Sequence, residues 1–126
     1  MNKKQRPVFL NLLKIKAPIT AYESFTHRVT GVFLILFLPL VMYMFVISLQ
    51  SEDSFQLATN YFENWFVRVI FWGGLTALSF HAISGVNHML RDLGFGKELD
   101  SASKMSAVVI LLTAISSVIL AIYLFS

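Results

Sequence analysis

Three histidines are the residues of this sequence that most need a hydrogen-bond partner or a metal to bind. His81 and His88 lie in one long apolar stretch, and His27 stands at the start of an earlier one. His81 precedes Arg91 by ten positions, which is about 15 Å along a helix and well inside a hydrocarbon layer. A neutral imidazole at that depth needs a hydrogen-bond partner or a metal.

The residues around His81 favour a flat, metal-bearing macrocycle as the partner. Helical spacing places small residues and two histidines along one side of the helix: Gly74, Ala77, His81, Ser84, Gly85 and His88. Small side chains clear the space that a haem needs beside its ligand helix, and Leu78 is the one bulky exception. Two other interpretations stay open, namely tight helix packing with an interhelical hydrogen bond from His81, and a proton relay.

The other polar residues of interest lie nearer the membrane surface. His88 is about 10 Å from His81 along the same face, so both cannot bind one iron. We expect a polar or haem-propionate contact there, or a hydrated histidine without a specific role. Ser24 and Arg28 are an i,i+4 pair that offers a hydroxyl and a permanent cation to a quinone oxygen. Alternatively, Arg28 reaches lipid phosphates, and His27 has the same ambiguity.

These residues must be positioned by membrane-spanning helices. The chain has 126 residues, of which 56% are hydrophobic and 13% charged. Three runs lack Asp, Glu, Lys and Arg, and each can cross about 30 Å of hydrocarbon. They lie between Arg28 and Glu52, between Arg68 and Arg91, and after Lys104. We predict an all-α membrane protein with one anchor domain over residues 1–126. Its parts are an interfacial segment at 1–19 and transmembrane helices at 21–50, 63–91 and 103–125.

Charge distribution predicts how these helices are oriented. Five basic residues precede Pro18, and the second connection is also basic, whereas the first connection carries acidic residues. The positive-inside rule then puts the amino terminus in the cytoplasm and the carboxyl terminus in the periplasm. The net charge of +3 is explained by this topology signal, so we expect no nucleic-acid partner. Because the chain has no cysteine, any thiolate-bound iron–sulfur cluster must belong to a partner.

The first helix has a recognisable start. Thr20 and Glu23 have the spacing of a capping box after Pro18, which predicts that helix begins near Ala21. Pro39 should kink the same helix. This start places Ser24, His27 and Arg28 on helix close to the inner surface.

Two segments resemble the cytochrome b large anchor subunit of succinate dehydrogenase. Residues 24–31 have the pattern S-x-x-H-R-x-[ST]-G, preceded by Arg6-Pro7 and by Pro-Ile-Thr-Ala at 18–21. Residues 81–92 have the pattern H-x-x-x-G-x-x-H-x-x-x-D on the second predicted helix. Length and the number of spans extend the resemblance to the full chain.

The resemblance implies that His81 is an axial ligand of a single haem b, whose iron takes its other ligand from a small membrane-anchor subunit. It also implies that Ser24 and Arg28 line a ubiquinone pocket and that His27 and Arg28 approach the haem propionates. The expected partners are the small anchor, an iron–sulfur subunit, a flavoprotein subunit and lipid, in the bacterial inner membrane. The chain is expected to act as a non-flavin subunit of a succinate:quinone oxidoreductase, and the isolated chain, with no catalytic residue of its own, is not expected to be catalytic.

Glu23 departs from the family pattern, in which a small or apolar residue is common. We expect it either to serve only the capping box or to face the quinone and alter proton supply. Two rival functions stay open for the chain. One is a haem-free structural anchor, and the other is the anchor of a fumarate reductase working in the reverse direction.

Overall fold

The computed structural model describes residues 17–126, which form four α-helices and no strand. The helices are α1 (Ile19–Ser48), α2 (Glu52–Tyr61), α3 (Trp65–Asp92) and α4 (Leu99–Phe125). The predicted all-α class is therefore confirmed. Most of the interfacial segment expected at 1–19 lies outside the described residues.

Three of the helices are long and apolar enough to cross a membrane, namely α1, α3 and α4. They have 30, 28 and 27 residues, and so each is about 40 Å long or more at about 1.5 Å per residue. Each contains all or most of one of the three runs without Asp, Glu, Lys and Arg. The predicted number of spanning helices is therefore confirmed.

The first connection between spanning helices forms a helix of its own, α2, over most of its length. Ser51 and Ser54 cap this helix reciprocally, with Ser54 N to Ser51 Oγ at 3.1 Å and Ser51 N to Ser54 Oγ at 3.0 Å. Glu52 and Asp53 occupy the first turn, where negative charge is favoured by the helix dipole. A cap and two acidic residues thus stabilise a helix too short and polar to span a membrane.

The start of α1 also differs from the expectation. Its N-cap is Pro18, no side chain caps it, and helix begins at Ile19. The predicted capping box of Thr20 and Glu23 is therefore wrong, because the Glu23 carboxylate points into the bundle instead. Helix continues without interruption through Pro39.

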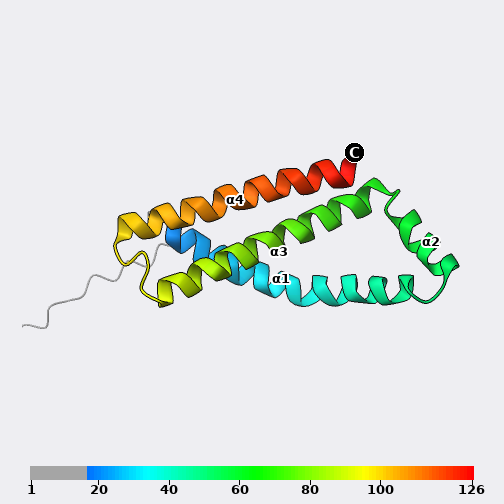
Figure 1. Ribbon diagram of the computed structural model, residues 1–126, viewed down its shortest axis with the longest axis horizontal. Coiled ribbons are helices and arrows are strands. Elements are labelled where there is room, and N and C mark those ends of the chain that lie inside the picture. Colours follow the sequence, from blue (N-terminus) through cyan, green and yellow to red (C-terminus); the bar gives the residue numbers. More distant parts are fainter. Residues whose placement is uncertain (1–16) are drawn as a thin grey trace, which may run out of the picture.

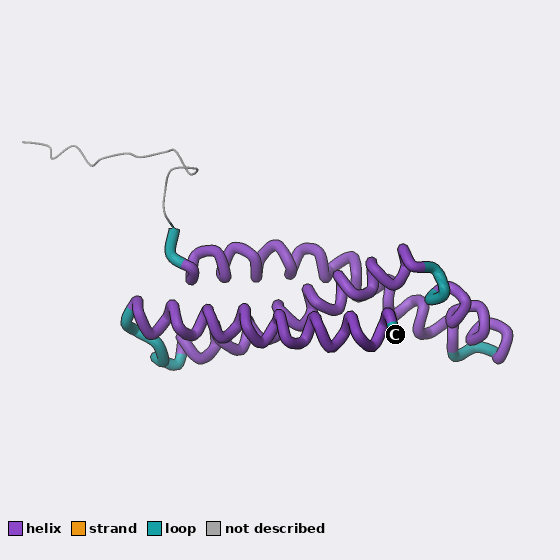
Figure 2. The backbone as a smooth tube through the Cα atoms, turned by 90° about the horizontal axis from the view of Figure 1, so that it is seen from above, coloured by secondary structure: helices purple, strands orange, loops and turns teal. Residues whose placement is uncertain are grey.

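The central helix is α3, which packs on both α1 and α4 (Figure 1). We call the end of the bundle where α1 begins, α3 ends and α4 begins the proximal end. The distal end is where α1 ends and α3 begins, with α2 between them. The start of α1 and the end of α4 lie at opposite ends of the molecule (Figures 1 and 2), as three crossings of a membrane require.

Burial in this bundle is the reverse of that in a water-soluble protein. Within residues 17–126 the buried apolar side chains are Leu34, Phe37 and Val109, whereas the buried polar ones are Glu23, Ser84, Asn87 and Ser106. Large apolar side chains such as Leu36 and Tyr123 are instead exposed, at 76% and 82%. This surface fits contact with lipid or with other membrane helices.

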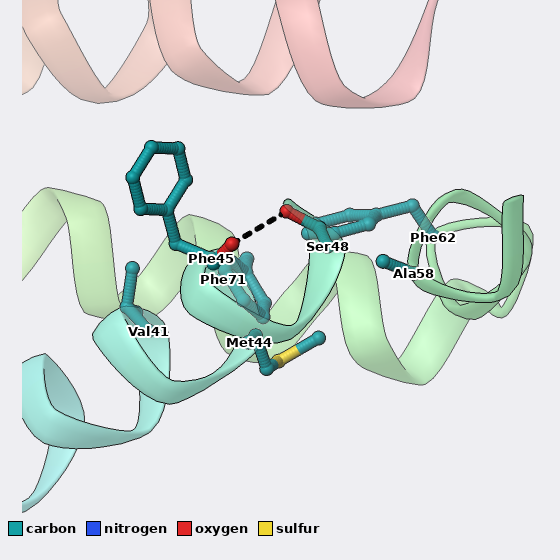
Figure 3. Close-up of a pocket in the computed structure, with 7 residues that line it drawn as sticks. All are labelled: Val41, Met44, Phe45, Ser48, Ala58, Phe62 and Phe71. Carbon is teal, nitrogen blue, oxygen red and sulfur yellow. Dashed lines mark hydrogen bonds between the residues drawn. The ribbon is translucent and has the colours of Figure 1, made fainter. Parts of the chain in front are cut away.

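At the distal end, α2 closes against α1 and α3 around a small apolar hollow of about 210 Å³. Figure 3 shows its lining, with Phe62 and Phe71 beside Met44, and with Ser48 Oγ donating to the Phe45 carbonyl at 2.7 Å. The Phe62 and Phe71 rings meet edge to face with centroids 4.6 Å apart. These contacts are more than ten residues along α1 from His27, so the hollow is separate from the candidate site.

Candidate functional site

The structure brings the three predicted histidines together at the proximal half of the bundle. The His27 ring, from α1, lies between the two rings from α3. Its centroid is 4.0 Å from that of His81, with an interplanar angle of 8°, and 5.0 Å from that of His88, with an angle of 22°. The stack thus joins His27 to residues that lie 54 and 61 positions later in the sequence. We call it the histidine stack.

The hydrogen bonds of His81 assign its protonation. Its Nδ1 lies 3.0 Å from the His27 carbonyl oxygen and 3.2 Å from Thr30 Oγ1. A carbonyl oxygen can only accept, so the proton belongs on Nδ1 and the lone pair on Nε2. Metal-binding histidines generally have this arrangement, in which the second ring nitrogen donates to a carbonyl and fixes the ring. His81 is therefore held with Nε2 in the state that a metal ion requires.

A second nitrogen of the stack also lacks a partner. His27 Nε2 is buried without a hydrogen bond to any described residue, and it faces Gly85, where an added Cβ would lie 3.4 Å away. A buried polar atom without a partner is uncommon in a native structure and calls for a ligand or water. Both nitrogens fit a site that binds a group from outside this chain.

The chain does not provide a complete site for a bare metal ion. Among residues 17–126 no group of three or more His, Cys, Asp or Glu side chains is placed to hold one. An iron at His81 would therefore need ligands beyond the residues that the structure describes. This requirement matches the chemistry of a haem, whose ring supplies four nitrogens.

The small residues of α3 pack closely against α1. A Cβ on Gly74 would come within 2.0 Å of Phe37 Cζ, so this glycine accommodates an aromatic ring of α1. Ser84 is fully buried, and Gly85 faces His27. These residues fit α1 against α3. The interhelical hydrogen bond of His81 that the packing interpretation expected is present, to the His27 carbonyl, and the haem interpretation stays a prediction.

A polar cluster that the sequence analysis did not predict lies directly behind His88. We call it the Glu23 cluster, and it comprises Glu23, Ser84, Asn87, Arg91 and Ser106. Glu23 Oε1 accepts from Ser84 Oγ at 2.8 Å and from Asn87 Nδ2 at 2.9 Å. Glu23 Oε2 accepts from an Arg91 terminal nitrogen at 2.6 Å, from Ser106 Oγ at 2.5 Å and from Asn87 Nδ2 at 3.1 Å. One carboxylate thereby joins all three spanning helices.

Only part of this arrangement was expected for Glu23. The residue is 2% exposed and its carboxylate does not cap α1, whereas its expected contact with a quinone stays a prediction. Part of the signal was present in the sequence. Ser84, Asn87 and Arg91 have i, i+3, i+7 spacing, which forms a polar stripe on one face of a helix. Such a stripe inside an apolar bundle predicts a buried partner of opposite charge.

Ser24 and Arg28 lie beside the histidine stack without joining it. Ser24 is half-buried and Arg28 is exposed, both on the first turns of α1. Within residues 17–126 neither side chain has a hydrogen-bond partner.

Comparisons with known proteins agree with this arrangement. Residues 2–121 match the model of the family described as succinate dehydrogenase/fumarate reductase transmembrane subunit. The chain is 33% identical to the succinate dehydrogenase cytochrome b556 subunit of Coxiella burnetii, over 96% of both chains. It is 28% identical to the subunit of the same name from Paracoccus denitrificans, over 99% of this chain and 96% of the relative. It is also 34% identical to the cytochrome b560 subunit of Marchantia polymorpha, over 75% and 72%.

Three spanning helices and bacterial relatives make this a multi-pass protein of the inner membrane. The family match covers nearly the whole chain, including both histidine patterns and the Glu23 cluster. The chain belongs to the succinate dehydrogenase/fumarate reductase transmembrane subunit family, as a cytochrome b membrane-anchor subunit of the succinate dehydrogenase type.

Proposed function

We propose that this chain binds haem b through His81 Nε2 and forms part of the quinone-reduction site of a succinate:ubiquinone oxidoreductase. The observation that carries the proposal is the pair of contacts at His81 Nδ1, to the His27 carbonyl and Thr30 Oγ1. They fix the tautomer and the ring orientation, and they leave Nε2 as the only nitrogen able to bind iron.

The other residues of the stack complete the proposed haem site. His27 Nε2, which has no partner among the described residues, would donate to a propionate, and Arg28 and His88 would supply further polar contacts. The second axial ligand would come from the small membrane-anchor subunit. When bound, an iron with two histidine ligands stores and passes single electrons and has no open position for substrate.

Ser24 and Arg28 would act on the quinone itself. The Ser24 hydroxyl can donate to a quinone carbonyl, and the Arg28 guanidinium can stabilise the negative charge that develops on that oxygen during reduction. Both lie at the proximal end, where the basic flanking residues predict cytoplasm. Electrons would come from the last cluster of a docked iron–sulfur subunit, which receives them from a flavoprotein subunit. In this scheme the anchor chain binds and positions, and it is not catalytic alone.

The reduced-minus-oxidised spectrum of the purified complex tests this proposal. His81→Ala should abolish the b-type signal while the other subunits remain bound. His88→Ala is the matched control, because it removes the neighbouring ring of the stack and should keep most of the signal. Loss of the signal in the His88 variant alone would show that the ligand has been assigned to the wrong histidine.

Two alternatives are tested by the same preparation. The packing of Gly74 against Phe37 and of Gly85 against His27 favours a haem-free structural anchor, for which the wild-type complex would show no b-type signal. The family description also includes fumarate reductase. A higher rate of fumarate reduction by quinol than of succinate oxidation would favour that direction.

A further inference from the structure

The Glu23 carboxylate is the most completely enclosed charged group described in this chain, and the proposed function gives it no role. Its side chain is fully buried, and it accepts hydrogen bonds from four residues. Isolated buried charge is very costly, so such groups are found paired and hydrogen-bonded. Here Arg91, 19% exposed, supplies the opposite charge.

This carboxylate touches the side of the histidine stack that faces away from His81. Its Oε1 lies 3.8 Å from His88 Nδ1. His88 Nδ1 is itself 2.8 Å from the Ser84 carbonyl and 3.5 Å from Ser84 Oγ, the hydroxyl that donates to Glu23. A carbonyl oxygen and a carboxylate beside one nitrogen both favour a proton on Nδ1. The Ser84 carbonyl therefore fixes the tautomer of His88. The Ser84 hydroxyl and the Glu23 carboxylate lie beside the same nitrogen and limit how the ring can turn.

The same contacts set how α1 lies against α3 at this level. Glu23 precedes His27 by four positions on α1, so both face α3. Its partners Ser84 and Asn87 flank Gly85, against which His27 packs. Because His27 lies between the His81 and His88 rings, a change in this register would move all three rings.

We propose that Glu23 is a positioning residue of the haem site, acting through Ser84 and His88 on the histidine stack and neutralised in place by Arg91. The proposal rests on the proposed function, since it assumes haem at His81. It adds that a buried, paired charge next to His88 fixes the positions of the histidine rings and the electrostatic environment of the iron. The roles expected from sequence were only a helix cap or a quinone contact. The exposed pair of Lys104 and Asp100, at 2.6 Å and with side chains 76% and 77% exposed, has no such role.

Two matched serine variants test the positional part. Ser84 and Ser106 are both fully buried, and each donates one hydrogen bond to Glu23. Ser84 lies beside His88, whereas Ser106 is on α4, on the other side of the carboxylate. In the purified complex, Ser84→Ala should shift the g values of the ferric haem, and Ser106→Ala should leave them unchanged although both lower the thermal midpoint. Equal effects on the haem signal, or none from Ser84→Ala, would overturn the proposal.

Charge variants test the electrostatic part. Glu23→Gln leaves the positive charge of Arg91 uncompensated, and nearby positive charge favours the reduced iron. The haem midpoint potential should therefore rise in Glu23→Gln and return toward the wild-type value in Glu23→Gln/Arg91→Met, where both charges are absent. If the cluster were purely structural, the double variant would change the midpoint potential more than Glu23→Gln does, because the double variant loses more hydrogen bonds. If the Glu23 variant does not assemble, the serine pair still decides.

The two proposals fail in different ways. A wild-type complex without a b-type spectrum would contradict haem binding at His81, and the role of Glu23 would fall with it. A normal wild-type spectrum, combined with g values and a midpoint potential that do not respond as stated, would contradict only the role of Glu23.

Discussion

Ser24 and Arg28 lie one helical turn apart at the start of α1, with no hydrogen-bond partner among residues 17–126. We predict that Ser24→Ala or Arg28→Leu lowers quinone reduction several-fold, because one removes a donor and the other a stabilising cation. Succinate oxidation with an artificial soluble acceptor should be nearly unchanged, since that electron route bypasses the membrane site. Rates with the two acceptors on the same preparation check this.

The control for this pair is Ser103→Ala, which removes a hydroxyl of α4 that donates only to the Leu99 carbonyl at 2.8 Å. Both rates should stay at the wild-type level in this variant. If Ser24→Ala instead lowers the two rates equally, the subunits have failed to assemble and the residue has no specific role at the quinone.

How well the site residues could be predicted from sequence depended on how far apart in the chain their partners lie. The histidines were recognisable because depth in an apolar run and spacing along one helix are local properties, although their mutual stacking was not foreseen. Glu23 was misassigned because Thr20 three positions earlier suggested a local cap. Its true partners lie 61 to 83 positions away, so a local pattern could show the polar stripe on α3 but not which carboxylate pairs with it.

Two adjacent glycines of α3 show how the spanning helices fit together. Gly74 lies under the ring of Phe37, whereas an added Cβ on Gly73 would meet nothing within 4 Å. We predict that Gly74→Ala destabilises the complex by about 1–3 kcal/mol, because overpacking forces α1 away from α3. Gly73→Ala should have no adverse effect, since alanine has the better helix propensity. Thermal denaturation of the purified variants compares them, and equal midpoints would contradict the close packing.

Arg68, on α3, connects the ends of α2 and α4 at the distal end of the bundle. Its Nε donates to the Phe62 carbonyl, and a terminal nitrogen donates to the Leu124 carbonyl at 3.2 Å. Those carbonyls lie at the ends of α2 and α4, where a cation also opposes the helix dipole. Arg68→Met should lower thermal stability by about 1 kcal/mol and increase proteolysis near α2. Unchanged proteolysis of the intact complex would show that α2 does not depend on this contact.

The three spanning helices were predictable because uncharged length is a strong signal in membranes. The helix α2 could not be predicted in this way, because hydropathy does not detect short polar helices. Its capping serines and acidic first turn were available as evidence, but they are weak signals without an apolar run beside them.

For the whole molecule, the orientation in the bilayer is a prediction that the absence of cysteine makes easy to test. In a chain with no cysteine, single cysteines can be introduced at Ser126, at the end of α4, and at Lys97, in the connection between α3 and α4. A membrane-impermeant thiol reagent added outside spheroplasts should label Ser126→Cys and spare Lys97→Cys. The reverse pattern would invert the topology and move Ser24 and Arg28 away from the cytoplasm.

The Glu23 cluster also has a consequence for how the helices enter the membrane during synthesis. Since synthesis proceeds from the amino terminus, α1 emerges first, with a carboxylate whose donors on α3 and α4 do not yet exist. Near the proximal end this group can remain in water until Arg91 and Ser106 arrive. We therefore expect the first helix to reach its final depth only after the last helix has entered the membrane.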